Sequence, residues 1–243
     1  MKVFMELKAH PDWVSEECIM PDIWESNHID VEAIGPVEAF GLSLGFTAQD
    51  GYLNLRQRFR SSISSDVSID QYPLDTTGTL ACLCTASELN EPVVMLSNNH
   101  VLAAATNSAR NGDPIDQPGR YDNGKAPIDR VAELFDFVPI AFEGRNNYVD
   151  AAVAKPDKNV KLSPEIQGIG KILEIVNEVE INTQLKKMER ATQLTKGTAK
   201  SVGGTFRVIY GPAGKAVLKD HIVIILELIQ LPSVQVESLA VWL

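Results

Sequence analysis

The sequence predicts an all-β protein. Its apolar residues fall in short continuous or alternating runs separated by Gly, Pro, Asn and Asp, and few stretches show helical periodicity over any length. Two groups of such runs flank a polar stretch at residues 155–168, and short strands in series commonly close into barrels or sandwiches. We therefore expect two β-barrels with short helices and an N-terminal extension.

The expected strands follow one another along the chain, each an apolar or alternating run bounded by turn residues. They are residues 37–44, 79–85, 93–97, 130–138, 151–154, 170–175, 198–202, 205–209 and 221–228. Turns are expected at residues 89–92, 111–114, 123–124, 202–204 and 211–214, and short helices at 101–105 and 179–187. These elements divide the chain into an N-terminal extension (1–75), a first barrel (76–156) and a second barrel (157–243).

Charge and composition narrow the classes of function. The chain has 243 residues, 44% of them hydrophobic, which is enough for one large domain or two small ones. Its 22 Lys and Arg against 32 Asp and Glu give a net charge of −10, which would repel nucleic acid and anionic lipid. No apolar window reaches the length that spans a bilayer. From the charge and from this length together, we expect neither a nucleic-acid nor a membrane partner.

The cysteines favour a reducing compartment. The chain has three, Cys18, Cys82 and Cys84, so they cannot all pair with one another. Cys82 and Cys84 lie two residues apart on an expected strand and therefore point the same way. We expect reduced thiols and a cytoplasmic protein.

His100 is the first candidate for chemistry among only four histidines. It follows an apolar run that turns polar at residues 97–99, where an imidazole can be fixed by the strand behind it and still face a cleft. A capping or core histidine is the ordinary alternative. Asn98 and Asn99, just before it, are expected to brace this turn.

Asp150 is the second candidate. It precedes a strand of small apolar residues, where a carboxylate is tolerated in a partly buried position if it accepts a hydrogen bond, for example from an imidazole N–H. An ordinary turn residue before a strand is the alternative. Arg190 is expected to form a surface ion pair.

Five segments together resemble the trypsin-like serine peptidases, in particular a bacterial, disulfide-poor group related to the plant narrow-leaf proteins. The segments are residues 77–83 (TGTLACL), 96–102 (LSNNHVL), 111–119 (NGDPIDQPG), 149–154 (VDAAVA) and 190–199 (RATQLTKGTA). They stand in the family's order and cover most of the chain from about residue 30 onward. The resemblance implies two six-stranded barrels that meet at a cleft, with His100 as general base and Asp150 orienting its ring. It also implies a polypeptide substrate, with no cofactor and no metal.

The nucleophile departs from the family pattern. The Gly-Asp-Ser-Gly motif of the family is missing, and Ser238 is the nearest match in position, with Glu237 where the acidic residue of the motif would stand. Ser238 has no flanking glycine to turn backbone N–H groups toward a substrate carbonyl. We expect the C-terminal part to be truncated or frame-shifted, the second barrel to be incomplete, and turnover to be low or absent.

Two hypotheses about the function follow. The first is a serine endopeptidase that works by acyl transfer through His100, Asp150 and Ser238. The second is a catalytically inactive pseudo-peptidase that binds a peptide or protein partner on the same scaffold. A metal hydrolase is disfavoured because His100 has no His or Cys within ten residues in the sequence. The glycine pairs 168/170 and 203/204 lack the rest of a phosphate loop, so they are expected to be turns.

Overall fold

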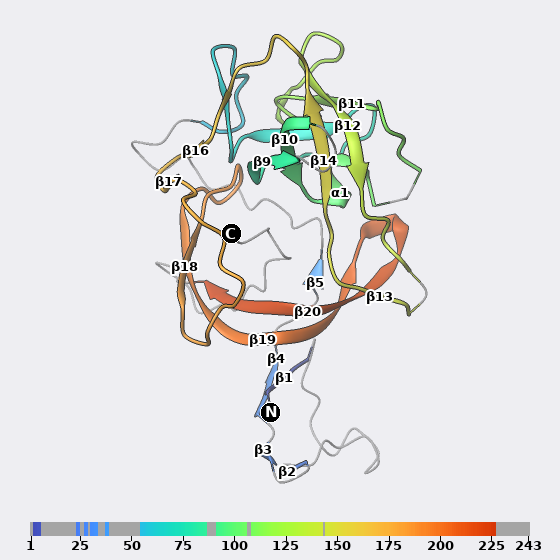
Figure 1. Ribbon diagram of the computed structural model, residues 1–243. Coiled ribbons are helices and arrows are strands. Elements are labelled where there is room, and N and C mark those ends of the chain that lie inside the picture. The colour runs from blue at the N-terminus through green and yellow to red at the C-terminus, as the bar shows by residue number, and fades with distance from the viewer. Residues whose placement is uncertain are drawn as a thin grey trace.

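The computed structural model describes residues 54–86, 91–105, 108–142 and 144–226, together with short strands between residues 2 and 38. Almost all of the regular structure in these residues is β, arranged as two large curled sheets (Figure 1). The predicted all-β class with two sheet units is therefore confirmed. In the part of the chain that is described, no helix is long and apolar enough to cross a membrane.

The first sheet has seven strands in the order β8-β7-β11-β12-β14-β10-β9. They are β7 (Ser68–Gln71), β8 (Gly78–Thr79), β9 (Cys82–Ala86), β10 (Glu91–Ser97), β11 (Pro114–Asp116), β12 (Arg130–Phe137) and β14 (Ala152–Pro156).

This sheet closes on itself. Its two ends, β8 and β9, belong to one run of chain interrupted only by Leu80 and Ala81. The Leu80 N–H donates to the Val67 carbonyl, beside β7, and the Ala81 N–H donates to the Leu96 carbonyl in β10, so hydrogen bonding continues across the seam. The seven strands therefore form a six-stranded barrel in which one strand is bent, and no edge is left open.

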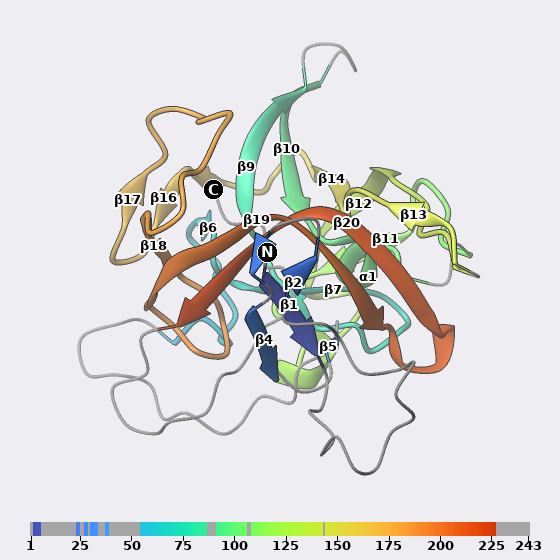
Figure 2. The same cartoon turned by 90° about the horizontal axis from the view of Figure 1, so that it is seen from below.

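Among the described strands, the second sheet does not close on itself, and one long hairpin dominates it. Its strands are β5 (Val37–Glu38), β13 (Asn146–Asn147), β18 (Gln184–Lys187), β19 (Thr195–Ile209) and β20 (Lys215–Leu226). The chain turns from β19 into β20 through a 3-10 turn, η5 (Gly211–Ala213). Figure 2 shows this hairpin arching across the lower side of the molecule.

The remaining elements are short. They are two-stranded pairs of β1 (Lys2–Met5) with β4 (Asp30–Ala33), β2 (Ile23–Trp24) with β3 (Asn27–His28), β6 (Ile63–Ser64) with β15 (Leu162–Ser163), and β16 (Glu165–Ile166) with β17 (Gly170–Lys171). The helical elements are α1 (Asn99–Leu102) and the 3-10 turn η4 (Arg120–Asp122).

Two apolar cores match the two sheets. The larger fills the first barrel and includes Ile69, Leu80, Met95, Ile115 and Leu134, each at most 1% exposed. A smaller cluster lies against the β19–β20 hairpin and consists of Ala105, Ile140, Val208, Tyr210, Ala216 and Leu218. Ala105 and Ile140 belong to connections between strands of the first sheet, so this second cluster joins the first barrel to the second sheet.

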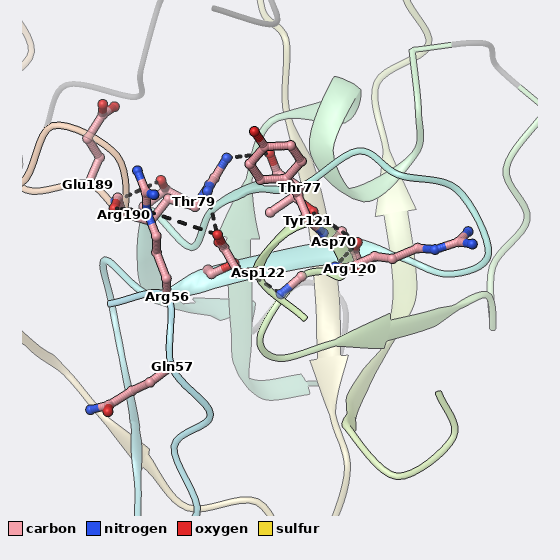
Figure 3. Close-up of polar contacts among 12 residues, drawn as sticks. Arg56, Gln57, Asp70, Thr77, Thr79, Arg120, Tyr121, Asp122, Glu189 and Arg190 are labelled. Atoms are coloured by element: carbon pink, nitrogen blue, oxygen red, sulfur yellow. Dashed lines mark hydrogen bonds and ion pairs between the residues drawn. The ribbon is translucent and has the colours of Figure 1, made fainter. Parts of the chain in front are cut away.

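A buried ion pair, shown in Figure 3, joins the loop before β19 to the 3-10 turn η4 beside the first barrel. Arg190, in the loop between β18 and β19, donates from Nη1 to Asp122 Oδ2 at 2.8 Å, and its guanidinium lies 5.8 Å from the centre of the Tyr121 ring. Asp122 also accepts from the Ser68 hydroxyl at 2.6 Å. The side chains of Arg190 and Asp122 are only 10% and 4% exposed. The expected ion pair of Arg190 exists, but the expectation that it lies on the surface is wrong.

Four expected elements differ from the sequence prediction. The strand expected at 170–175 is limited to Gly170–Lys171. Beyond it, Leu173 and Ile175 are 93% and 81% exposed, so these alternating apolar residues do not pack on a sheet. The turn expected at 202–204 lies inside β19, where Gly203 adopts a φ of +72° and the pairing with β20 resumes after a shift in register.

The two expected helices also change. The helix expected at 179–187 is wrong, because Gln184–Lys187 pairs with β19 as strand β18. The helical turn after His100 begins earlier than expected, at Asn99, and stops at Leu102 because Ala104 and Ala105 have positive φ. Most of the strand expected at 37–44 lies outside the described residues.

Candidate active site

His100 stands on α1, directly after strand β10 leaves the first barrel. Ser97, the last residue of β10, is fully buried and its hydroxyl donates to the Thr79 carbonyl at 2.7 Å. The backbone N–H groups of Val101 and Leu102 donate to the Asn98 carbonyl and close the turn. The imidazole is therefore carried by a short helix anchored to a buried strand end.

Asp150 reaches the same place from the neighbouring strand. β10 and β14 are antiparallel, with Ser97 opposite Ala152. Residues that follow Ser97 and residues that precede Ala152 must therefore leave the barrel at the same end. Three residues before Asp150 the chain is held to the second sheet by Asn147, whose amide donates to the Ala141 and Val217 carbonyls.

The two candidate side chains are hydrogen bonded. His100 Nδ1 lies 2.6 Å from Asp150 Oδ2, and the His100 backbone N–H donates to Asp150 Oδ1 at 3.2 Å. The residues are 9% and 7% exposed. Asp150 thus holds both the ring and the backbone of His100, which fixes the ring orientation and favours the tautomer with hydrogen on Nδ1.

Tyr210 supplies a third contact from the second sheet. It follows β19 directly, and its hydroxyl donates to Asp150 Oδ2 at 3.0 Å. Its ring meets the His100 ring edge to face at a centroid distance of 6.0 Å. Burial, together with the charge and hydrogen bond of Asp150, raises the pKa of the Tyr210 hydroxyl, so it remains a donor.

Asp150 is held as a carboxylate. Burial acts to raise the pKa of Asp150, but the electrostatic interaction with His100 and the hydrogen bonds from His100 and Tyr210 lower it by more. The pKa of Asp150 therefore lies below its ordinary value. A charged, acceptor-only carboxylate is the form that can orient the imidazole and stabilise it when it takes up a proton.

The two asparagines before His100 brace the turn, as the sequence predicts. Asn98 donates to the Asp150 carbonyl at 3.0 Å, which links the two strand ends a second time. Asn99 is fully buried, donates to the Val138 carbonyl at 2.7 Å and accepts from the Ala105 N–H at 3.2 Å. The position of His100 is thus fixed by side chains on both sides of the turn.

Solved bacterial serine proteases are similar to this chain in fold at low sequence identity. Protease A of Thermobifida fusca is 11% identical, with a TM-score of 0.44, over 68% of this chain and 72% of that one. The chymotrypsin of Cellulomonas bogoriensis is 10% identical, with a TM-score of 0.42, over 73% and 76% of the two chains. The Nocardiopsis protease is 13% identical, with a TM-score of 0.43, over 73% and 77%. No protein-family model and no curated protein matches the sequence.

Of the three residues expected to act together, the structure joins His100 and Asp150. Ser238 and Glu237 lie outside the described residues. Tyr210 was missed by the sequence reasoning. Its only signal is an aromatic residue with a hydroxyl at the end of an apolar strand and before Gly211-Pro212, which does not indicate a contact 60 residues back in the chain.

Proposed function

We propose that this chain is a serine-type endopeptidase in which His100 is the general base, Asp150 orients it and Ser238 is the nucleophile. The observation that supports the proposal is the buried hydrogen bond of 2.6 Å between His100 Nδ1 and Asp150 Oδ2. A carboxylate bonded to one imidazole nitrogen leaves proton transfer to the other nitrogen, Nε2, which is the division of labour that acyl transfer requires.

The proposed reaction has two halves. The Ser238 hydroxyl adds to the scissile carbonyl carbon while His100 takes the hydroxyl proton, and the imidazole then gives that proton to the departing amine. A water molecule repeats the sequence on the acyl-enzyme, which releases the carboxylic acid and restores the serine. The substrate is a polypeptide, and neither a metal nor a cofactor takes part. We expect slow turnover because glycines do not flank Ser238.

The second candidate function is a pseudo-peptidase that binds a peptide or protein without cutting it. The missing Gly-Asp-Ser-Gly motif favours this candidate. A buried His–Asp pair also stabilises a fold without catalysis, so the pair serves both candidates.

Labelling of the full chain with a fluorophosphonate separates the two candidates, because only an activated serine reacts. The peptidase proposal predicts a label on Ser238 that is lost in Ser238→Ala and reduced in His100→Ala. Ser233→Ala, a change of the same kind in the same segment, should leave the label in place. A chain that takes up no label, or takes it up equally with His100→Ala, contradicts the peptidase and favours the pseudo-peptidase. We propose a cytoplasmic location from the cysteine content, and cell fractionation tests it.

A further inference from the structure

Strand β9 carries two cysteines whose sulfur atoms face each other. Cys82 and Cys84 are two residues apart on an extended strand, so both side chains leave the same face. Their Sγ atoms are 3.4 Å apart. Cys82 is 3% exposed, Cys84 is half-buried, and both are free thiols.

The two thiols are chemically unequal. A hydrogen bond from the Cys82 thiol stabilises the Cys84 thiolate and outweighs the effect of burial, which lowers the pKa of Cys84 to about 7. The same hydrogen bond, together with burial, raises the pKa of Cys82. At neutral pH a substantial fraction of the more accessible sulfur, about half, is thus a nucleophilic thiolate, and the buried sulfur beside it keeps its proton.

We propose that Cys82 and Cys84 form a redox-active dithiol, a modification site at which a hydroperoxide oxidises the pair to an intramolecular disulfide. The Cys84 thiolate attacks the peroxide, the O–O bond breaks, and Cys84 becomes a sulfenic acid while hydroxide leaves. The Cys82 sulfur then attacks the Cys84 sulfur, the S–O bond breaks, and the oxygen departs as water. Overall, two thiols lose two hydrogens, and hydrogen peroxide is reduced to two water molecules.

The strand can accommodate this bond with a local adjustment. Residues two apart on an extended strand have Cα atoms about 6.4–6.8 Å apart. Disulfides span Cα distances of about 4.4–6.8 Å, most often about 5.5–6 Å. The two Cα atoms need to approach each other by roughly an ångström or less. The irregular register of β9 against β10, between Glu91 and Val94, lies beside Cys84, which pairs with Val94.

A disulfide suits this pair better than a metal. Among the residues that the structure describes, no group of three or more Cys, His, Asp or Glu side chains is placed to hold an ion, and zinc bound by proteins takes three or four such ligands. Two thiols, one of them ionised and the other in contact with it, are instead the complete set that thiol oxidation requires.

Peptide mapping of the full chain tests the proposal without reference to peptidase activity. No Lys or Arg lies between Arg60 and Arg110, so digestion with trypsin places both cysteines on one peptide that excludes Cys18. After the folded protein is treated with hydrogen peroxide and its free thiols are alkylated, we expect this peptide to carry no alkyl group and to have lost two hydrogens. Dithiothreitol should restore both alkylation sites.

Variants distinguish the two roles. Cys18→Ser should leave the oxidation unchanged, whereas Cys82→Ala should leave a sulfenic acid on Cys84 that dimedone captures and excess peroxide converts to oxygen-rich products. The proposal is overturned if the wild-type peptide keeps both thiols, gains oxygen instead of losing hydrogen, or links Cys84 to Cys18. Because the wild-type chain alone decides these outcomes, a folding failure of either variant does not blunt the test.

Discussion

The two sheets of this molecule are built by different means. The first closes through one bent strand, β8–β9, and surrounds a core of sixteen buried apolar residues. The second is an open sheet built on a 15-residue strand and a 12-residue strand, and a small cluster supports it. The candidate site belongs mainly to the closed sheet, which supplies both His100 and Asp150 through neighbouring strand ends. The open sheet adds the Tyr210 hydroxyl and the carbonyl that holds Asn147.

The two sheets therefore make different contributions to the candidate site. The closed barrel fixes the imidazole and the carboxylate by its own register, so their hydrogen bond depends on the first core. The second sheet adds a hydrogen bond to the Asp150 carboxylate from the Tyr210 hydroxyl. Perturbations of the two sheets should therefore have different effects on stability and on the pair.

The largest effect is expected from a truncation in the first core. Leu134→Ala should lower the free energy of unfolding by about 3–5 kcal/mol, because Leu134 is 1% exposed in a closed barrel that cannot collapse around the cavity. The equivalent change Leu218→Ala in the small cluster should cost less, about 2–3 kcal/mol. Urea unfolding measures both, with the exposed Leu173→Ala as a control. Equal costs would show that the two sheets are equally rigid.

The buried ion pair between the halves comes next. Asp122→Ala leaves Arg190 without its carboxylate and should cost about 3 kcal/mol or more. Glu133→Ala removes a partner from Arg130 in a pair that is 37% and 41% exposed, and should change stability by less than about 1 kcal/mol. Thermal unfolding of the two variants tests this contrast. A harmless Asp122→Ala would mean that the junction does not hold the loop before β19.

The pH dependence of stability should have opposite signs in two places. Burial raises the pKa of Asp66 and of Asp70, both beside or within the first barrel, to about 6. Each carboxyl contributes on the order of 1–3 kcal/mol to the free energy of unfolding. This contribution is fully present below the ordinary Asp pKa of about 4 and is lost as the pH rises through about 6. Asp150, whose pKa is lowered, contributes stability at neutral pH that is lost as the pH falls below its ordinary range.

Urea titrations from pH 3 to pH 8 resolve these contributions. Asp70→Asn should flatten the decline in stability near pH 6, and Asp150→Asn should instead flatten the loss at acid pH. A decline near pH 6 that survives removal of both Asp66 and Asp70 would contradict the assignment.

The smallest expected effect comes from the hydroxyl of Tyr210. Tyr210→Phe removes a donor to a charged acceptor and should lower stability by about 1–2 kcal/mol. Tyr148→Phe, at a site 66% exposed, should have no measurable effect. Calorimetry compares the two. If they behave alike, the open sheet contributes nothing to the pair through this bond.

Only part of the closed barrel was predictable, because its short strands β7 and β11 were not among the expected strands. The apolar runs of β10, β12 and β14 predicted their strands closely, because each is short, buried and bounded by turn residues. The long hairpin was misjudged at Gly203, since a glycine pair marks a turn and a bulge equally well in the sequence. His100 and Asp150 could be found because His100 follows an apolar run that turns polar and Asp150 precedes a strand of small apolar residues. Tyr210 could not be found, because its contact with Asp150 depends on how the two sheets are placed.

The hydrogen bond between His100 and Asp150 holds the candidate site together, and proton magnetic resonance tests it directly. We expect a far-downfield Nδ1–H signal, because N–H bonds to carboxylates are short and strong. This signal should vanish in His100→Gln, shift in Asp150→Asn and survive in His221→Gln, where the ring bonds to the Lys219 backbone carbonyl. If no downfield signal depends on both His100 and Asp150, the two side chains are not joined by this hydrogen bond.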